Sequence, residues 1–138
     1  MNNRQRATNN EVRDKVKEVF AALRKDGFVA RVNFQDCSTT ACLELNKQLK
    51  EDAKKHYVVF WHRADEIYYQ KTGYLAIRFG SEGNSKEDDI IAACKIVEYL
   101  TKFKVVHHWT GNPSEVIYAF DSVASKMQYL TKRTRREN

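Results

Sequence analysis

The thiol and imidazole groups are the side chains of this sequence best suited to chemistry, and three of them form a candidate cluster: Cys37, Cys42 and His62. Zinc binds both residue types, and a structural zinc site normally takes its ligands from two close pairs such as Cys-x-x-Cys. Here the close cysteine pair has the spacing Cys-x4-Cys, which departs from that pattern. The leading prediction is therefore no cofactor, with zinc bound by Cys37, Cys42 and His62 as the alternative.

A nucleophilic thiol is the second chemistry that this cluster allows. Cys37 precedes a helix expected over residues 39–55, and a helix N-terminus lowers the pKa of a thiol, which His62 could deprotonate as a base. Cys94 falls on the apolar stripe of a helix expected over residues 86–104, so we expect it in the core. A thiol reagent should then label Cys37 well before Cys94. An enzyme centred on Cys37, Cys42 and His62 is the alternative function.

The elements that would position these groups follow the order strand, helix, strand, strand, helix, strand. This order predicts an α+β domain with a ferredoxin-like split β-α-β sheet. A further strand over 115–120, a helix before residue 27 and a short helix from residue 121 extend it. The segment 63–72 is interpreted as a long loop. The expected strands cover 28–34, 57–62, 74–79 and 105–109, and the expected helices cover 39–55 and 86–104.

Length and charge limit the classes of protein to consider. The chain has 138 residues, of which 42% are apolar, which predicts one domain over 1–130 followed by a basic flexible tail over 131–138. Its 24 basic and 18 acidic residues give a formal charge of +6, which favours an anionic partner. The N-terminal residues lack an apolar core, and no apolar run approaches the roughly 20 residues that span a bilayer. We therefore expect a cytoplasmic protein without membrane contact.

Polar side chains on the two alternating strands give the strongest functional signal. In a ferredoxin-like sheet the first and third strands are neighbours, so the outward groups of these strands would lie together. Arg31 and Arg78 should share a face, away from Leu45 and Val97. The alternative is that the first helix covers this face. The predicted binding residues are Arg31, Asn33, Tyr74, Arg78, Trp61 and Trp109.

The third expected strand resembles that of the RNA-recognition-motif family. The residues in that frame are Thr72-Gly73-Tyr74-Leu75-Ala76-Ile77-Arg78-Phe79. The resemblance implies a base-stacking role for Tyr74. Ala76 and Ala30 stand where the family has further aromatic residues.

A second resemblance covers residues 27–117 and points to an uncharacterised bacterial domain family. It rests on Gly27-Phe28-Val29-Ala30-Arg31 with Asn33-Phe34, a cysteine cluster, Phe60-Trp61-His62-Arg63-Ala64-Asp65, Gly73 with Leu75, Phe79-Gly80, Trp109-Thr110-Gly111 and Ile117. The family's cluster is usually Cys-Cys-x-x-Cys-Gly, whereas this chain has Cys37 and Cys42 without the glycine. The resemblance implies no function. It singles out Arg31, Asn33, His62, Asp65, Trp109 and Gly111.

The leading hypothesis from the sequence is a non-enzymatic binding or regulatory module for an anionic macromolecule, either nucleic acid or an acidic protein surface. The sheet residues would hold the partner, and basic residues of the tail would add charge attraction. A third hypothesis is a homodimer through the sheet, in which the arginines meet acids such as Glu115. The contributing tail residues are Lys132, Arg133, Arg135 and Arg136.

Overall fold

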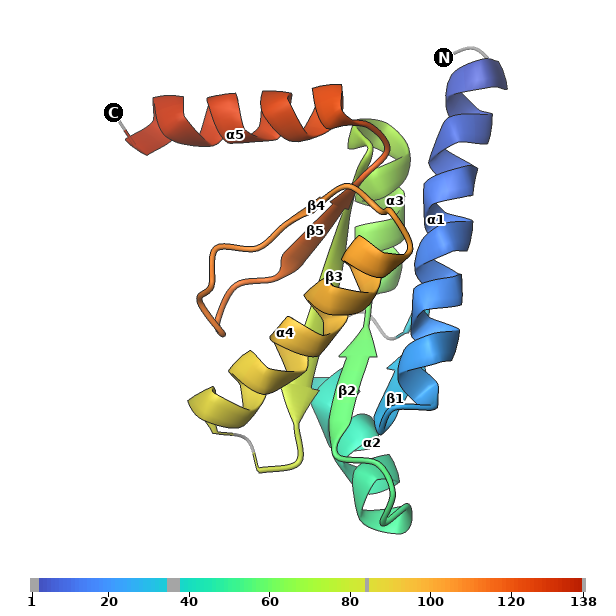
Figure 1. The fold of residues 1–138 in the computed structure, drawn as a ribbon, viewed down its shortest axis with the longest axis vertical. Helices are drawn as coiled ribbons and strands as arrows, with labels where there is room; N and C mark the ends of the chain where they lie inside the picture. The colour runs from blue at the N-terminus through green and yellow to red at the C-terminus, as the bar shows by residue number, and fades with distance from the viewer. Residues whose placement is uncertain (1–2, 35–37, 84, 138) are drawn as a thin grey trace.

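The structure is a computed structural model that describes residues 3–34, 38–83 and 85–137, with side chains described over 11–34, 43–83 and 85–133. Within these described residues, five helices and five strands follow one another (Figure 1). None of the helices in this described part has the length and apolar character to cross a membrane. In chain order the elements are α1 (Asn3–Arg24), β1 (Phe28–Arg31), α2 (Ser38–Glu51), β2 (Tyr57–Phe60), α3 (Arg63–Thr72), β3 (Tyr74–Ser81), α4 (Lys86–Lys102), β4 (His107–His108), β5 (Ile117–Phe120) and α5 (Val123–Glu137).

The strands form one mixed sheet in the order β1-β2-β3-β5-β4. The ferredoxin-like α+β class, with an added C-terminal strand and extra terminal helices, is confirmed. Within that class, the expected contact between the first and third strands is wrong. The chain crosses over through α2 and returns as β2 parallel to β1, and β3 then pairs antiparallel with β2. β1 is therefore an edge strand, and β2 separates it from β3.

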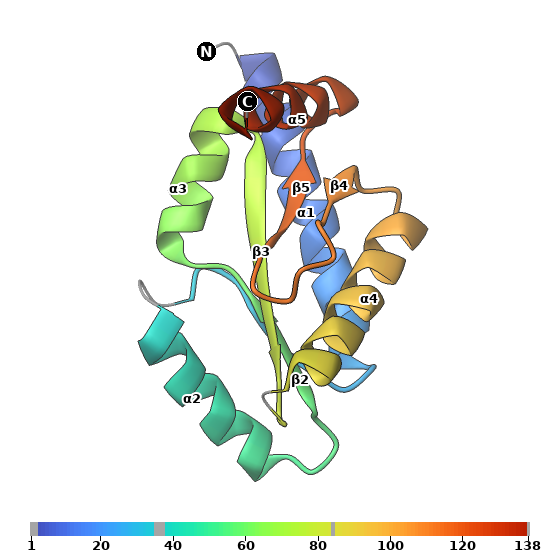
Figure 2. The same cartoon turned by 90° about the vertical axis from the view of Figure 1, so that its left-hand side faces the viewer.

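The two faces of the sheet are covered differently. α1 and α4 pack together on one face, where Val16, Phe20 and Ile96 join the main core with Ile77 of the sheet. Figure 2 shows α1 behind the sheet. On the opposite face, α2 covers only the β1–β2 half through Leu45 and Leu49, and α5 crosses the far end of the sheet. Among the described elements, α3 also contacts β3 on this face, where Asp65 pairs with Arg78.

Residues 63–72 form the helix α3, and the prediction of a loop is wrong. The Asp65 carboxylate accepts a hydrogen bond from the backbone N–H of His62 at 2.8 Å and so caps the first turn. Gly73 ends the helix, with its N–H donated to the Tyr69 carbonyl at 2.8 Å. Only Asp65 and Tyr69 of this helix are buried. One apolar buried position is too few to produce a helical period in the sequence.

The C-terminal helix α5 continues to Glu137, so residues 131–137 are helical where we expected a flexible tail. The apolar repeat that predicted a short helix stops at Leu130. Beyond it the helix consists of polar residues, including lysines and arginines, which favour helix without contributing an apolar stripe. The basic charge of this segment is therefore presented on a helix.

Gly73, which follows α3, lies close to the side chain of Asp121, and its replacement by alanine is our first stability prediction. The residue has φ +80°, and a Cβ there would lie 2.6 Å from Oδ2 of Asp121. Gly111 has a similar φ of +91° with no atom within 4 Å of its Cβ position. We expect Gly111→Ala to lower the free energy of unfolding by about 1 kcal/mol through strain alone. Gly73→Ala should cost roughly 2–3 kcal/mol, because strain and the clash add. Urea denaturation of both variants measures the two losses of unfolding free energy. Equal losses would show that the Asp121 side chain moves aside without a cost in stability.

Candidate binding site

The two sheet arginines share one face, as the sequence predicted. Arg31 is in register with Phe60, and Phe60 is in register with Arg78, so the three side chains project to the same side. Leu45 of α2 packs against Phe60 on that side, so the expectation that this face lies away from Leu45 is wrong. The cover comes from α2, and the suggestion that the first helix covers this face is also wrong. Two strand spacings, about 9–10 Å, separate the arginines.

Both arginines already have hydrogen-bond acceptors within the chain. Arg78 donates from Nε and Nη2 to the carboxylate of Asp65 at 2.8 and 3.0 Å. This pairing raises the pKa of Arg78. Arg31 donates to its neighbour's carbonyl, Ala30 O, at 2.9 Å and to the side-chain oxygen of Gln48. An anion that bound here would compete with Asp65 or Gln48 for these donors.

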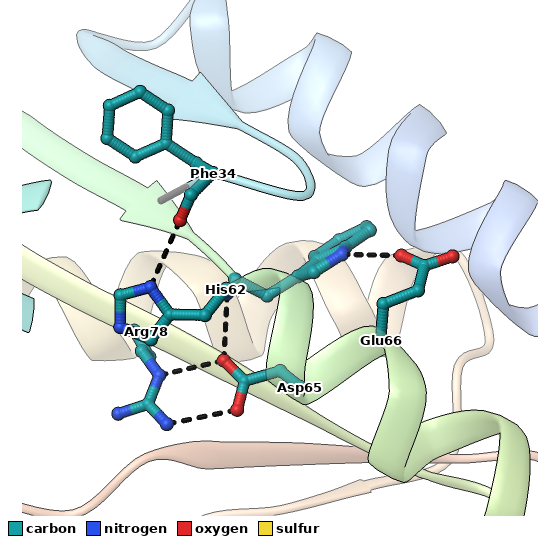
Figure 3. Close-up of polar contacts among 6 residues, drawn as sticks. Phe34, His62, Asp65, Glu66 and Arg78 are labelled. Carbon is teal, nitrogen blue, oxygen red and sulfur yellow. Dashed lines mark hydrogen bonds and ion pairs between the residues drawn. The ribbon is translucent and has the colours of Figure 1, made fainter. Parts of the chain in front are cut away.

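Asp65 also belongs to a network that fixes the start of α3 to the sheet (Figure 3). The buried His62 ring lies with Nδ1 3.0 Å from the Phe34 carbonyl oxygen. Trp61 is fully buried and donates from Nε1 to Glu66 at 2.7 Å. These contacts join the ends of β1 and β2 to α3 and β3. They give Trp61, His62 and Asp65 a structural role.

Of the remaining predicted sheet residues, Asn33 and the two tryptophans do not join the arginines, whereas Tyr74 lies on their face at the start of β3. Asn33 lies beyond the end of β1, exposed and with φ +50°. Trp109 packs edge-on against Phe79 at 6.0 Å between ring centroids and donates from Nε1 to the Asn112 carbonyl at 3.0 Å. Phe79 packs against the main core, so Trp109 lies on the α1–α4 side of the sheet with Trp61.

Within the described residues, the structure tests one of the thiol predictions, the burial of Cys94. Cys94 is exposed, so its assignment to the core is wrong. The buried stripe of α4 runs through Ala92, Ala93, Ile96 and Leu100, which turns Cys94 toward solvent. Cys37 lies outside the described residues, as does the side chain of Cys42. Where side chains are described, no group of three His, Cys, Asp or Glu could hold a metal ion, and zinc at Cys37, Cys42 and His62 stays a prediction.

A hollow beneath α5 lies on the same face of the sheet as the arginines, toward β5. It has a volume of about 820 Å³, and we call it the tyrosine groove. α3 and the start of β3 form one wall, Tyr118 of β5 is on the floor, and α5 forms the other wall. It is lined by Tyr68, Lys71, Thr72, Tyr74, Tyr118, Asp121, Ser122, Ala124, Ser125, Gln128, Tyr129, Lys132 and Arg133. A smaller hollow of about 160 Å³ extends it past Tyr118 and Arg133 to His108 and Glu115.

Ring contacts hold the groove in shape. Tyr129 of α5 lies 4.9 Å from the Tyr118 ring centroid and 5.7 Å from that of Tyr74. This packing fixes α5 across the sheet and leaves Tyr74 only 6% exposed. Tyr68 on α3 is 51% exposed, so much of its surface remains available to a ligand.

The charge of the groove is positive among the residues described as lining it. Lys71, Lys132 and Arg133 stand against the single acid Asp121, whose carboxylate accepts hydrogen bonds from the hydroxyls of Ser122 and Ser125. Arg133 also donates to the Tyr129 hydroxyl at 3.0 Å and to Glu115 at 3.2 Å.

The phenols of Tyr118 and Tyr74 stay protonated near neutral pH because the pKa of each is raised. Burial raises the pKa of the Tyr118 hydroxyl, with smaller contributions from Tyr129 and Tyr68, and burial also raises that of Tyr74. Protonated phenols can donate hydrogen bonds to an oxyanion. At the end of the groove, burial lowers the pKa of His108, which keeps that ring uncharged near pH 7.

Most of the groove residues were missed from the sequence, including Tyr68, Lys71, Tyr118 and Tyr129. Tyr68 and Lys71 fell in the supposed loop, and Tyr118 and Tyr129 had no motif around them. The available signal was the number of tyrosines near the C-terminus beside basic residues. Lys132 and Arg133, predicted as tail residues, and Tyr74, predicted on the sheet, are the sequence-derived candidates that the groove brings together.

A family model described as "Domain of unknown function (DUF6891)" matches residues 3–122. The chain belongs to this family. The expectation of an uncharacterised domain family is thereby confirmed. No curated protein and no solved structure matches the chain. The DUF6891 match includes α3 and the sheet but ends one residue before α5, so it contains only one wall and the floor of the tyrosine groove.

Proposed function

We propose that this chain is a non-enzymatic binding module for an anionic partner and that the tyrosine groove is its binding surface. The observation that carries the proposal is the groove itself, in which Lys71 and Lys132 on opposite walls flank the protonated phenol of Tyr118 on the floor. Clustered positive charge in a concave site attracts anions more strongly than the same charge on a flat surface. Nucleic acid and acidic protein segments both carry the required negative charge.

The contacts of the basic residues favour the groove over the sheet arginines. Arg31 and Arg78 donate to acceptors of the same chain, whereas Lys71 and Lys132 are exposed at the groove. Because α5 is helical here, the backbone of Lys132 is already ordered. Binding therefore costs less conformational entropy than it would for a flexible tail.

The proposal also changes which tyrosine would stack on a base, compared with the resemblance to the RNA-recognition motif. Stacking a base on Tyr74 would require α5 to move, since Tyr129 packs against that ring. The aromatic group offered to a partner at the groove is instead the exposed Tyr68.

A matched pair of charge variants tests the proposal. Lys71→Gln with Lys132→Gln removes two charges at the groove, and Lys47→Gln with Lys50→Gln removes two exposed charges from α2. Binding of a labelled 12-nucleotide single strand and of a polyglutamate peptide of equal charge is followed by fluorescence anisotropy over a salt series. The groove variant should weaken binding of at least one ligand. For the oligonucleotide its log–log salt slope should fall by about 1.4, two counterion contributions of about 0.7. The α2 variant should change neither slope appreciably.

Equal weakening by the two variants would mean that net charge alone governs binding, and it would remove the groove from the account. The absence of binding by either polymer at low salt would reject the module function itself. Circular dichroism of each variant confirms that folding is retained.

A further inference from the structure

We infer that the partner is single-stranded nucleic acid and that Tyr68 stacks on one of its bases. This inference rests on the proposed function, since it names the anion that the tyrosine groove takes. The decisive feature is an exposed aromatic ring placed at the wall of a cationic groove.

The ring of Tyr68 is left available by its neighbours. Its nearest ring partner, Tyr74, lies 6.4 Å away between centroids and is tilted by 60°, so the two rings are not stacked. Single exposed apolar groups are common on protein surfaces, but Tyr68 lines the groove and is held on a helix. A base that stacked on this ring would bury surface that the folded chain leaves in water. Such stacking accepts any base, because every base has a π-face.

Basic side chains lie on both walls of the groove, along which the phosphates of a bound strand would pass. Lys71 is three residues after Tyr68 on α3, so the two side chains are neighbours on one helical surface. Lys132 is on the opposite wall of the groove, beside Arg133, which is paired with Glu115. A single strand supplies a phosphate on each side of every base, and so it can satisfy both walls while one base meets Tyr68.

The same features disfavour the other anionic macromolecules. An acidic peptide would use the cations but offers no flat ring to Tyr68. Duplex nucleic acid keeps its bases stacked within the helix, out of reach of a side chain that needs a free base face. The combination of ring and charge therefore selects an unpaired strand.

A ligand without bases separates stacking from charge. The ligands are a 12-nucleotide oligothymidine, an abasic 12-mer with the same phosphates and the polyglutamate peptide, tested on the full chain. Oligothymidine should bind the unaltered protein roughly five- to 150-fold more tightly than the abasic strand. Tyr68→Leu should abolish this preference and leave affinity for the abasic strand unchanged. Tyr68→Phe should preserve it, because the ring remains.

The neighbouring exposed residue supplies the control. Ile67→Ala removes an apolar side chain that is not among the groove-lining residues, and it should leave all three affinities unchanged. Equal affinity for the oligothymidine and abasic strands, or an equal loss for both in Tyr68→Leu, would overturn the stacking inference. Groove-dependent binding of polyglutamate that matches or exceeds that of oligothymidine would reject nucleic acid while leaving the proposed function intact. If no ligand binds, both fail together.

Discussion

Replacement of Trp61 by alanine is expected to lower the free energy of unfolding by about 3–5 kcal/mol, the usual cost of truncating a large buried aromatic residue. Trp61 is 0% exposed and its ring centroid lies 5.1 Å from that of Phe20 on α1. Its Nε1 also donates to Glu66 at 2.7 Å, and Glu66 accepts from Arg13 at 2.7 Å. The substitution therefore opens a cavity and leaves Glu66 with one fewer donor. Urea denaturation followed by circular dichroism measures the loss.

Two further variants separate packing from hydrogen bonding at this position. Trp61→Phe retains most of the ring volume but lacks the N–H donor, so it should cost less than Trp61→Ala. Trp109→Ala removes a tryptophan that is only partly buried and should also cost less. If Trp61→Ala weakened anion binding at unchanged stability, Trp61 would be a binding residue as the sequence first suggested.

Replacement of Asp65 by alanine should cost roughly 2–3 kcal/mol. Removing one partner of a buried ion pair typically costs about 3–5 kcal/mol, and the value here is lower because the Arg78 side chain is 32% exposed. The variant also loses the hydrogen bond from the His62 backbone N–H that caps α3. Thermal and urea denaturation would both report the change.

A surface ion pair provides the comparison for Asp65. Glu82 lies 2.9 Å from Nδ1 of His56, with its side chain 54% exposed, so Glu82→Ala should cost less than about 1 kcal/mol. In a double-mutant cycle, adding Arg78→Met to Asp65→Ala should recover part of the loss, because the unpaired guanidinium is removed. Additive losses would show that the two side chains contribute independently.

Much of the fold could be predicted because local patterns and tertiary packing agree. Alternation along residues 74–79 identified β3, which the structure extends to Ser81. Ser85 caps α4 and accepts from the Asp88 N–H at 3.1 Å. α3 was missed because its first turn is stabilised by Asp65, a polar contact that hydrophobic periodicity does not detect. Cys94 was misplaced because the apolar residues Ile90 and Ile91 suggested an inward stripe, although both are exposed.

The tyrosine groove could not be predicted because its parts are distant in sequence. Tyr68, Tyr118 and Tyr129 come from three elements, and their proximity depends on the pairing of β3 with β5 and on the direction of α5. The shared face of Arg31 and Arg78 was predicted from strand alternation, although the expected pairing of their strands was wrong and Phe60 of β2 lies between them in register. Their acceptors, Gln48 and Asp65, lie on helices whose placement no strand pattern specifies.

The most direct test of the tyrosine groove as the anion-binding surface is a ¹H–¹⁵N NMR titration of the protein with the 12-nucleotide single strand. The account predicts that the largest amide shifts fall on Tyr68–Gly73, on Tyr118 and along the α5 residues from Ser125 to Arg133. The amides of α2, which carries the exposed control lysines Lys47 and Lys50, should change little. Shifts centred on α2 and the β1 edge around Arg31, with the groove unaffected, would contradict the account.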